Sequence, residues 1–136
     1  MPYWGLAYSL GLKYNKTWDF FDDHDLQTTV DKAHRATALA AEKVAAAWPV
    51  EKALAHAIQA RYPWVHDQHG SREETSIWSQ EYAEAMTAVC REFPNDLDVA
   101  ALCVDALMNL TPWKLWDLRS RIALGTVAPQ VLADRA

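Results

Sequence analysis

The feature that most constrains the fold is a break at Pro94-Asn95-Asp96, which separates two stretches with apolar residues at helical spacing. The stripe before the break consists of Tyr82, Ala85, Met86, Val89 and Phe93, and the stripe after it consists of Val99, Leu102, Cys103, Ala106, Leu107 and Leu110. Pro94 cannot continue a helix, and Asp96 can cap the next helix through its side-chain oxygen. Because so short a connection makes two helices antiparallel neighbours, the sequence predicts a helical hairpin over residues 82–110.

Helical patterns also precede this hairpin. We expect a first helix over residues 1–12, an ordered aromatic loop with a short helical turn over 13–22, and a long helix from an aspartate cap at Asp22, Asp23 or Asp25 to about residue 47. Pro49 then begins a helix that runs to Tyr62, and a further helix begins near residue 73 or 75, with Ser71 and Glu74 as a candidate capping box. Residues 113–119 can form one or two more helical turns. The predicted fold is therefore all-α.

Several of these segments resemble tetratricopeptide (TPR) proteins. The block Ala88-Val89-Cys90-Arg91-Glu92-Phe93-Pro94-Asn95-Asp96 is similar to the junction between two such repeats. A narrower resemblance is to the N-terminal half of a group of longer microbial TPR proteins of poorly defined function. It is carried by segments 3–8, 14–18, 98–102 and 108–113. The resemblance spans about residues 2–119. It implies a right-handed, TPR-like stack of five or six antiparallel helices over residues 1–119, followed by a weakly structured tail over 120–136.

Two internal self-matches favour a repeat architecture. Residues 57–63 align with residues 88–94 at an offset of 31, and the aromatic element beginning at Trp18 aligns with the one beginning at Trp113 at an offset of 95. The second offset is close to three times the first, and the first is close to the TPR period of about 34 residues. We therefore interpret Trp18 and Trp113 as packed corners that close the ends of helical pairs.

Composition excludes several classes of partner. The chain has 136 residues, which fits one domain, and 13 basic against 18 acidic residues give a net charge of −5. This balance argues against a nucleic-acid surface and against binding to anionic membranes, both of which need a basic face. No apolar run reaches membrane-spanning length, and no secretory signal is recognisable at the N-terminus, so we expect a cytoplasmic protein.

The sequence assigns no catalytic residue. Cys90 and Cys103 fall within the apolar stripes and are predicted to be buried small hydrophobes, since a nucleophile would need a nearby base or basic field. The aspartates at positions 22, 23 and 25 are explained by helix capping, and no glycine-rich phosphate loop is present. The sequence therefore favours a protein that is not an enzyme, and no cofactor is predicted.

A metal site is the alternative that the histidines leave open. His66 and His69 have the spacing of a ligand pair, and a third ligand could be Asp67, Glu73 or His56, the last of which is on the preceding predicted helix. The competing interpretation is a solvated polar loop. The longer TPR proteins that this chain resembles carry further histidine-rich motifs, which it lacks.

The aromatic corners are the other candidate site. In the functional interpretation they form the rim of a concave surface, with a ligand set of Asn15, Lys16, Trp18, Asn109 and Trp113. Concave helical stacks recognise peptides or helices, so we expect a module for protein–protein interaction or self-assembly. The apolar start of the first helix favours a homo-oligomer or a position within a longer protein. The alternative is a small-molecule- or metal-binding protein whose aromatic corner lines a pocket.

Overall fold

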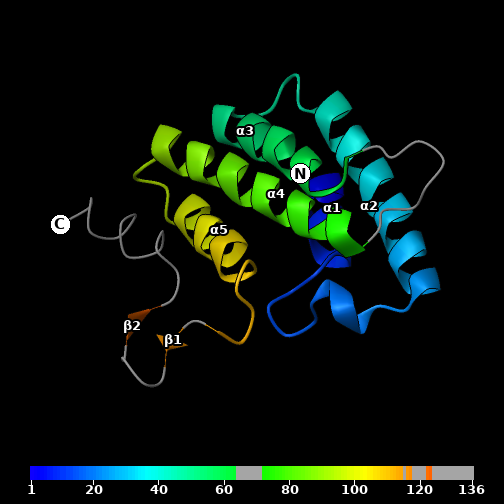
Figure 1. Cartoon of the computed structure of the whole chain (residues 1–136). Helices are drawn as coiled ribbons and strands as arrows, with labels where there is room; N and C mark the ends of the chain where they lie inside the picture. The colour runs from blue at the N-terminus through cyan, green and yellow to red at the C-terminus, as the bar shows by residue number, and fades with distance from the viewer. Residues whose placement is uncertain (64–71, 115, 118–121, 124–136) are drawn as a thin grey trace.

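The computed structural model describes residues 1–63, 72–114, 116–117 and 122–123 (Figure 1). Its α-helices are α1 (Pro2–Leu10), α2 (Asp23–Lys43), α3 (Pro49–Ala57), α4 (Arg72–Glu92) and α5 (Leu97–Met108). The 3₁₀ helix η1 (Trp18–Phe20) precedes α2, and the 3₁₀ helix η2 (Ile58–Arg61) follows α3. Two short strands, β1 (Trp116–Asp117) and β2 (Ile122–Ala123), pair antiparallel. The prediction of an all-α fold is confirmed.

Helix boundaries follow the local chemistry that the sequence indicates. Asp22 caps α2, because its Oδ1 accepts a hydrogen bond of 2.8 Å from the backbone N–H of Asp25. Asp96 caps α5 in the same way, since its Oδ1 accepts 3.0 Å hydrogen bonds from the N–H groups of Asp98 and Val99. Pro49 occupies the first turn of α3, where its missing N–H has no cost. The α4–α5 hairpin therefore forms where it was predicted.

Three details differ from the prediction. α2 ends at Lys43, before residue 47, and α3 tightens into η2 before it reaches Tyr62. The expected helical turns at residues 113–119 are wrong for the residues that the structure describes, because Trp113 has a positive φ of 63° and Trp116–Asp117 is extended. A non-glycine residue in this left-handed region interrupts the right-handed helical path. Ser71, the first member of the candidate capping box, lies outside the described residues.

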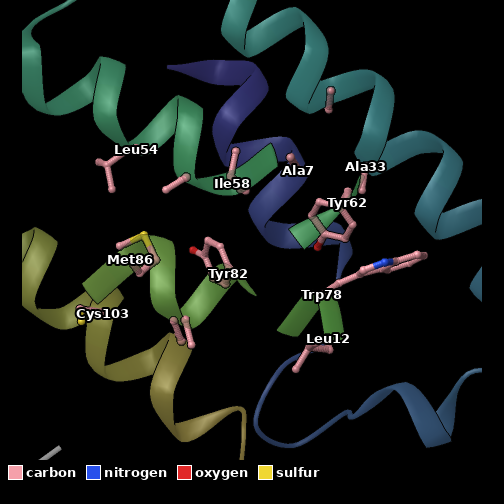
Figure 2. Close-up of a cluster of buried hydrophobic side chains, with 14 of the residues drawn as sticks. Ala7, Leu12, Ala33, Leu54, Ile58, Tyr62, Trp78, Tyr82, Met86 and Cys103 are labelled. Atoms are coloured by element: carbon pink, nitrogen blue, oxygen red, sulfur yellow. The ribbon is translucent and has the colours of Figure 1, made fainter. Parts of the chain in front are cut away.

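The core is organised around α1, which lies among the other helices (Figure 1). The indole Nε1 of Trp4 donates to the carbonyl of Leu54 in α3 at 3.1 Å, and the hydroxyl of Tyr8 donates to Oδ2 of Asp105 in α5 at 2.8 Å. Figure 2 shows a cluster of buried side chains to which α1 contributes Ala7 and the rest of the chain contributes, among others, Ile58, Tyr62, Tyr82, Met86 and Cys103. Cys90 is also buried, so the prediction for both cysteines is confirmed.

The contact between Tyr8 and Asp105 joins the first and last α-helices of the described chain. In a linear solenoid each repeat contacts only its neighbours. A linear stack does not require a contact between its first and last helices, whereas the described helices have one. The TPR-like, right-handed stacking therefore stays a prediction.

The two self-matches also differ in structure. Residues 58–61 form a 3₁₀ helix, whereas their counterparts lie in α4, and Trp18 is buried whereas Trp113 is 62% exposed. Trp18 is thus a packed corner, as expected, but Trp113 is not. The predicted C-terminal tail over residues 120–136 lies outside the described part except at β2.

Among the described helices, none combines the length and the apolar character that crossing a membrane would require.

Candidate functional site

A cavity of about 150 Å³ lies where η1, the first turns of α4 and the end of α5 meet. Its apolar lining comes from Trp18 of η1 and from Leu12, Leu110 and Pro112. Its polar lining consists of Thr17, Asp19, Thr75, Ser76, Ser79 and Asn109. Residues with hydroxyl, carboxylate and carboxamide side chains therefore line the cavity together with apolar residues, and no basic residue is among the described residues that line it.

The α4 side of the cavity is polar because of helical spacing. Thr75 and Ser79 are four residues apart and so lie on one face of α4. The Ser79 hydroxyl donates to the carbonyl of Thr75 at 2.8 Å, which uses its only hydrogen and leaves its oxygen lone pairs available as acceptors.

Thr75, which is fully buried, is one buried polar residue of the cavity, and the other is Asn109, with 8% of its surface exposed. Its Nδ2 donates to the backbone carbonyl of Asp105 at 2.9 Å and to Oδ2 of the same residue at 3.2 Å. Because both partners are acceptors, the orientation of the amide is fixed. Its Oδ1 therefore lies on the other side, and this atom has no hydrogen-bond partner in the described part of the chain. Burying an unpaired carbonyl oxygen costs about 1–3 kcal/mol, so the structure carries an unused acceptor at this point.

A buried polar cluster lies behind the cavity and is formed by Arg61, Tyr8, Tyr62, Tyr82 and Asp105. Arg61 is 2% exposed, and its Nη2 donates to the carbonyl of Leu12, which also lines the cavity. The guanidinium carbon lies 5.1–5.7 Å from the centroids of the three tyrosine rings, which is within cation–π range. Its Nε and Nη1 have no hydrogen-bond partner among the described residues.

The tyrosine hydroxyls of this cluster stay neutral to high pH. Burial, followed by the hydrogen bond to Asp105 and the negative charge of that residue, raises the pKa of Tyr8 to about 12, although the charge of Arg61 acts in the opposite direction. Burial also raises the pKa values of Tyr62 and Tyr82, again against the effect of Arg61. Around neutral pH these hydroxyls therefore supply no negative charge to balance the buried guanidinium.

Three exposed apolar side chains are sequence neighbours of residues that line the cavity. Phe20, Ile77 and Trp113 directly follow the cavity residues Asp19, Ser76 and Pro112, and they are 66%, 56% and 62% exposed. The ring of Trp113 packs against that of Tyr14, with 5.5 Å between the centroids. We call Phe20, Ile77 and Trp113 the apolar rim.

The structure brings together only part of the predicted ligand set. Trp18 and Asn109 line one cavity, although they are 91 positions apart in the sequence (109 − 18). Asn15, Lys16 and Trp113 are exposed and do not line it, and Lys16 instead places its Nζ 4.0 Å from the centre of the Phe21 ring.

Sequence reasoning missed the remaining polar residues of the site. The spacing of Thr75 and Ser79 was a usable signal, because it places two hydroxyls on one face of a predicted helix. Arg61 carried no clear signal, since it stands beside Tyr62 in a stretch that also contains the polar residue Gln59. Nothing local indicated that Asp19 would lie near Asn109.

The predicted metal site is not brought together in the described part of the chain. His56 is exposed, and its Nδ1 lies 3.3 Å from Nε2 of Gln59. His66 and His69 lie outside the described residues, so that pair is not tested. Among the residues that the structure does describe, no group of three or more His, Cys, Asp or Glu could hold a metal ion.

A second hollow, of about 250 Å³, lies along α4 and α5 between Gln80 and Leu110. None of its described lining residues carries a buried polar atom without a partner. The cavity at η1 is therefore the better candidate site.

Comparison with protein-family models, with curated proteins and with solved structures finds no match to this chain. The resemblance to TPR proteins thus stays a prediction, and the function is argued from the site alone.

Proposed function

We propose that the chain is a binding module that mediates a protein–protein interaction through the cavity at η1 and the apolar rim. The observation that carries this proposal is the combination of an exposed apolar rim with a small cavity lined by polar and apolar residues. Protein interfaces commonly combine aromatic anchors with a few polar contacts that fix the register.

The size of the cavity favours a protein partner over a free ligand. Pockets for drug-sized molecules have volumes of about 300–1,000 Å³, whereas this cavity measures about 150 Å³. A volume of this size suits one side chain of a larger partner, whose neighbouring residues would contact Phe20, Ile77 and Trp113. A binding protein for a ligand of only a few atoms is the second candidate, because the polar residues that line the cavity would serve such a ligand equally well.

We propose that this interaction takes place in the cytoplasm, in keeping with the acidic composition. A second copy of the chain is one candidate partner, since rim residues of one copy could contact those of another. Light scattering over a range of concentrations distinguishes this case, because self-association raises the mass and replacement of Trp113 by Ser lowers it again.

The test of the function is a selection of peptides from a random library on the immobilised protein, followed by calorimetry of the selected peptides. Replacing Trp113 by Ser should weaken their binding at least tenfold, a loss of about 1.4 kcal/mol. The matched control is Trp48→Ser, because Trp48 is 75% exposed but lies between α2 and α3. Equal losses in the two variants, or no loss in Trp113→Ser, would contradict the proposal.

A further inference from the structure

We propose that two copies of this chain associate through the hollow along α4 and α5, with Glu84 of each copy paired with Arg91 of the other. The hollow shares only Leu110 with the cavity at η1. The inference therefore concerns a different surface and does not rest on the proposed function.

The hollow combines apolar residues at α5 with polar residues of α4. It measures about 250 Å³ and lies where α4 and α5 run side by side (Figure 1). Leu107 of α5 and the following Leu110 line it, and both remain partly exposed although they pack against the core. The opposite side comes from α4, with Gln80, Ala83, Glu84, Thr87 and Arg91. Apolar surface is thus bordered by a polar helix face, which is typical of a protein interface.

The polar residues of α4 follow the spacing of a helix–helix seam. Gln80, Glu84, Thr87 and Arg91 are separated by four, three and four positions, which keeps them on one side of the helix. Glu84 and Arg91 are both exposed and stand seven positions apart, or roughly 10 Å along the helix axis. One seam thus carries a negative and a positive group two turns apart.

This charge pattern is its own complement when it is reversed. A twofold axis midway between positions 84 and 91, at Thr87 and Ala88, makes two α4 helices antiparallel and places each Glu84 opposite the Arg91 of the other copy. Closed dimers with one self-complementary patch are the commonest form of protein association. An unrelated partner would have to present an acid and a base at the same separation, whereas a second copy supplies them by symmetry.

The residues near the axis tolerate burial. The Thr87 hydroxyl donates to the carbonyl of Ala83 at 2.8 Å, so no hydroxyl hydrogen is left unpaired when the seam closes. Ala88 is small and exposed and lets two helices approach closely. One carboxylate oxygen of Glu84 accepts a hydrogen bond of 2.9 Å from Nε2 of Gln80, and a carboxylate has further lone pairs for a guanidinium.

The overall charge limits the strength of this dimer. Each copy carries a net charge of −5, so two copies repel one another at long range. The hollow itself contributes one acidic and one basic residue and is locally neutral. Burial of the exposed parts of Leu107 and Leu110 favours association. We expect a small interface and a dissociation constant on the order of micromolar.

The experiment measures the mass of the full chain in solution by sedimentation equilibrium over a range of concentrations. The wild type should rise from one chain of 15.4 kDa to twice that mass. Glu84→Arg and Arg91→Glu should each raise the dissociation constant at least tenfold, because like charges then face one another across the seam. Circular dichroism checks that both variants, which change exposed residues, remain folded.

Rescue of the dimer distinguishes charge pairing from unfolding. One variant carries two basic groups on its seam and the other carries two acidic groups, so an equimolar mixture should form a mixed dimer. The double variant Glu84→Arg/Arg91→Glu exchanges the charges and should dimerise as the wild type does. The matched controls are Glu42→Arg and Arg35→Glu, which make the same changes seven positions apart on exposed sites of α2 and should leave the dissociation constant unchanged.

The outcomes separate this inference from the proposed function. A wild type that stays at the mass of one chain up to millimolar concentration, an unchanged dissociation constant in either charge variant, or a mixture that stays monomeric would each overturn the inference. A dimer that Trp113→Ser dissociates and the charge variants preserve would also overturn it, and would support self-association through the apolar rim. Binding of library peptides to the monomeric Glu84→Arg variant tests the proposed function independently of the dimer.

Discussion

Gly11 lies directly against the side chain of Tyr62. A Cβ atom at position 11 would lie 1.7 Å from Oη and 2.8 Å from Cζ of Tyr62, and Tyr62 is fully buried and has no room to move. The φ angle of Gly11 is −79°, which every residue adopts, so the requirement at this position is for space and not for backbone freedom.

We therefore expect Gly11→Ala to lower the free energy of unfolding by about 1–3 kcal/mol, as overpacking of a core does. Urea unfolding followed by circular dichroism measures this loss. The matched control is Gly5→Ala in α1, where a Cβ would meet nothing within 4 Å, and this change should stabilise the protein by about 0.5–1 kcal/mol. Similar stabilities for the two variants would contradict the packing between Gly11 and Tyr62.

The elements depend on a few local signals, of which the cap of α5 is the clearest. The carboxylate of Asp96 satisfies two backbone N–H groups that have no partner within the helix. Asp98 occupies the first turn of the same helix, where the structure gives its carboxylate no such capping bond. The stability of the α4–α5 hairpin should therefore be much more sensitive to position 96 than to position 98.

Replacing Asp96 by Ala should destabilise the protein by about 1 kcal/mol, since two N–H groups lose their acceptor. Asp96→Asn should retain most of the stability, because an asparagine side chain also caps helices. Urea unfolding of both variants and of Asp98→Ala checks the assignment. A loss in Asp98→Ala as large as that in Asp96→Ala would show that charge at the helix end matters here and that the cap does not.

These local signals also explain how much of the fold the sequence could predict. Pro49, Asp22 and Asp96 mark helix starts by chemistry that acts within four residues, so those boundaries were predictable. The backbone at Trp113 was not, because only its surroundings decide whether a residue adopts φ of 63°. Only some of the residues that line the cavity were predictable from the sequence. Trp18 and Asn109 stood out as a large aromatic and a polar residue beside apolar stripes, but no periodicity indicates that η1 meets the end of α5.

At the scale of the whole molecule, the buried polar cluster couples elements that are distant in the sequence. Tyr8 of α1 binds Asp105 of α5, Arg61 of η2 binds the carbonyl of Leu12, and Asn109 orients Asp105 from beyond the end of α5. Two residues of this network, Leu12 and Asn109, also line the candidate cavity. Changes in this cluster are therefore expected to affect global stability and the shape of the cavity together.

This coupling predicts a loss of stability at alkaline pH. The folded state favours the neutral hydroxyl of Tyr8, so the stabilisation by this group is intact below its ordinary pKa of 10 and falls as the pH rises toward 12. Because Tyr8 is partly exposed, solvent screening reduces the effect to on the order of 1 kcal/mol. Urea unfolding between pH 8 and 11.5 should show the difference between the wild type and Tyr8→Phe shrinking above pH 10. A constant difference over this range would contradict the role of the Tyr8–Asp105 hydrogen bond.

The contact between Tyr8 and Asp105 also has a consequence for the newborn chain. α1 is synthesised before α5, and Asp105, the acceptor for the Tyr8 hydroxyl, follows 97 residues after Tyr8. At a synthesis rate of about 5–20 residues per second, roughly 5–20 seconds pass before Asp105 has been added. During that interval α1 can already pack on α2 and bind Leu54 of α3, but Tyr8 lacks its acceptor. The contact between α1 and α5 is therefore a late step in bringing these helices together.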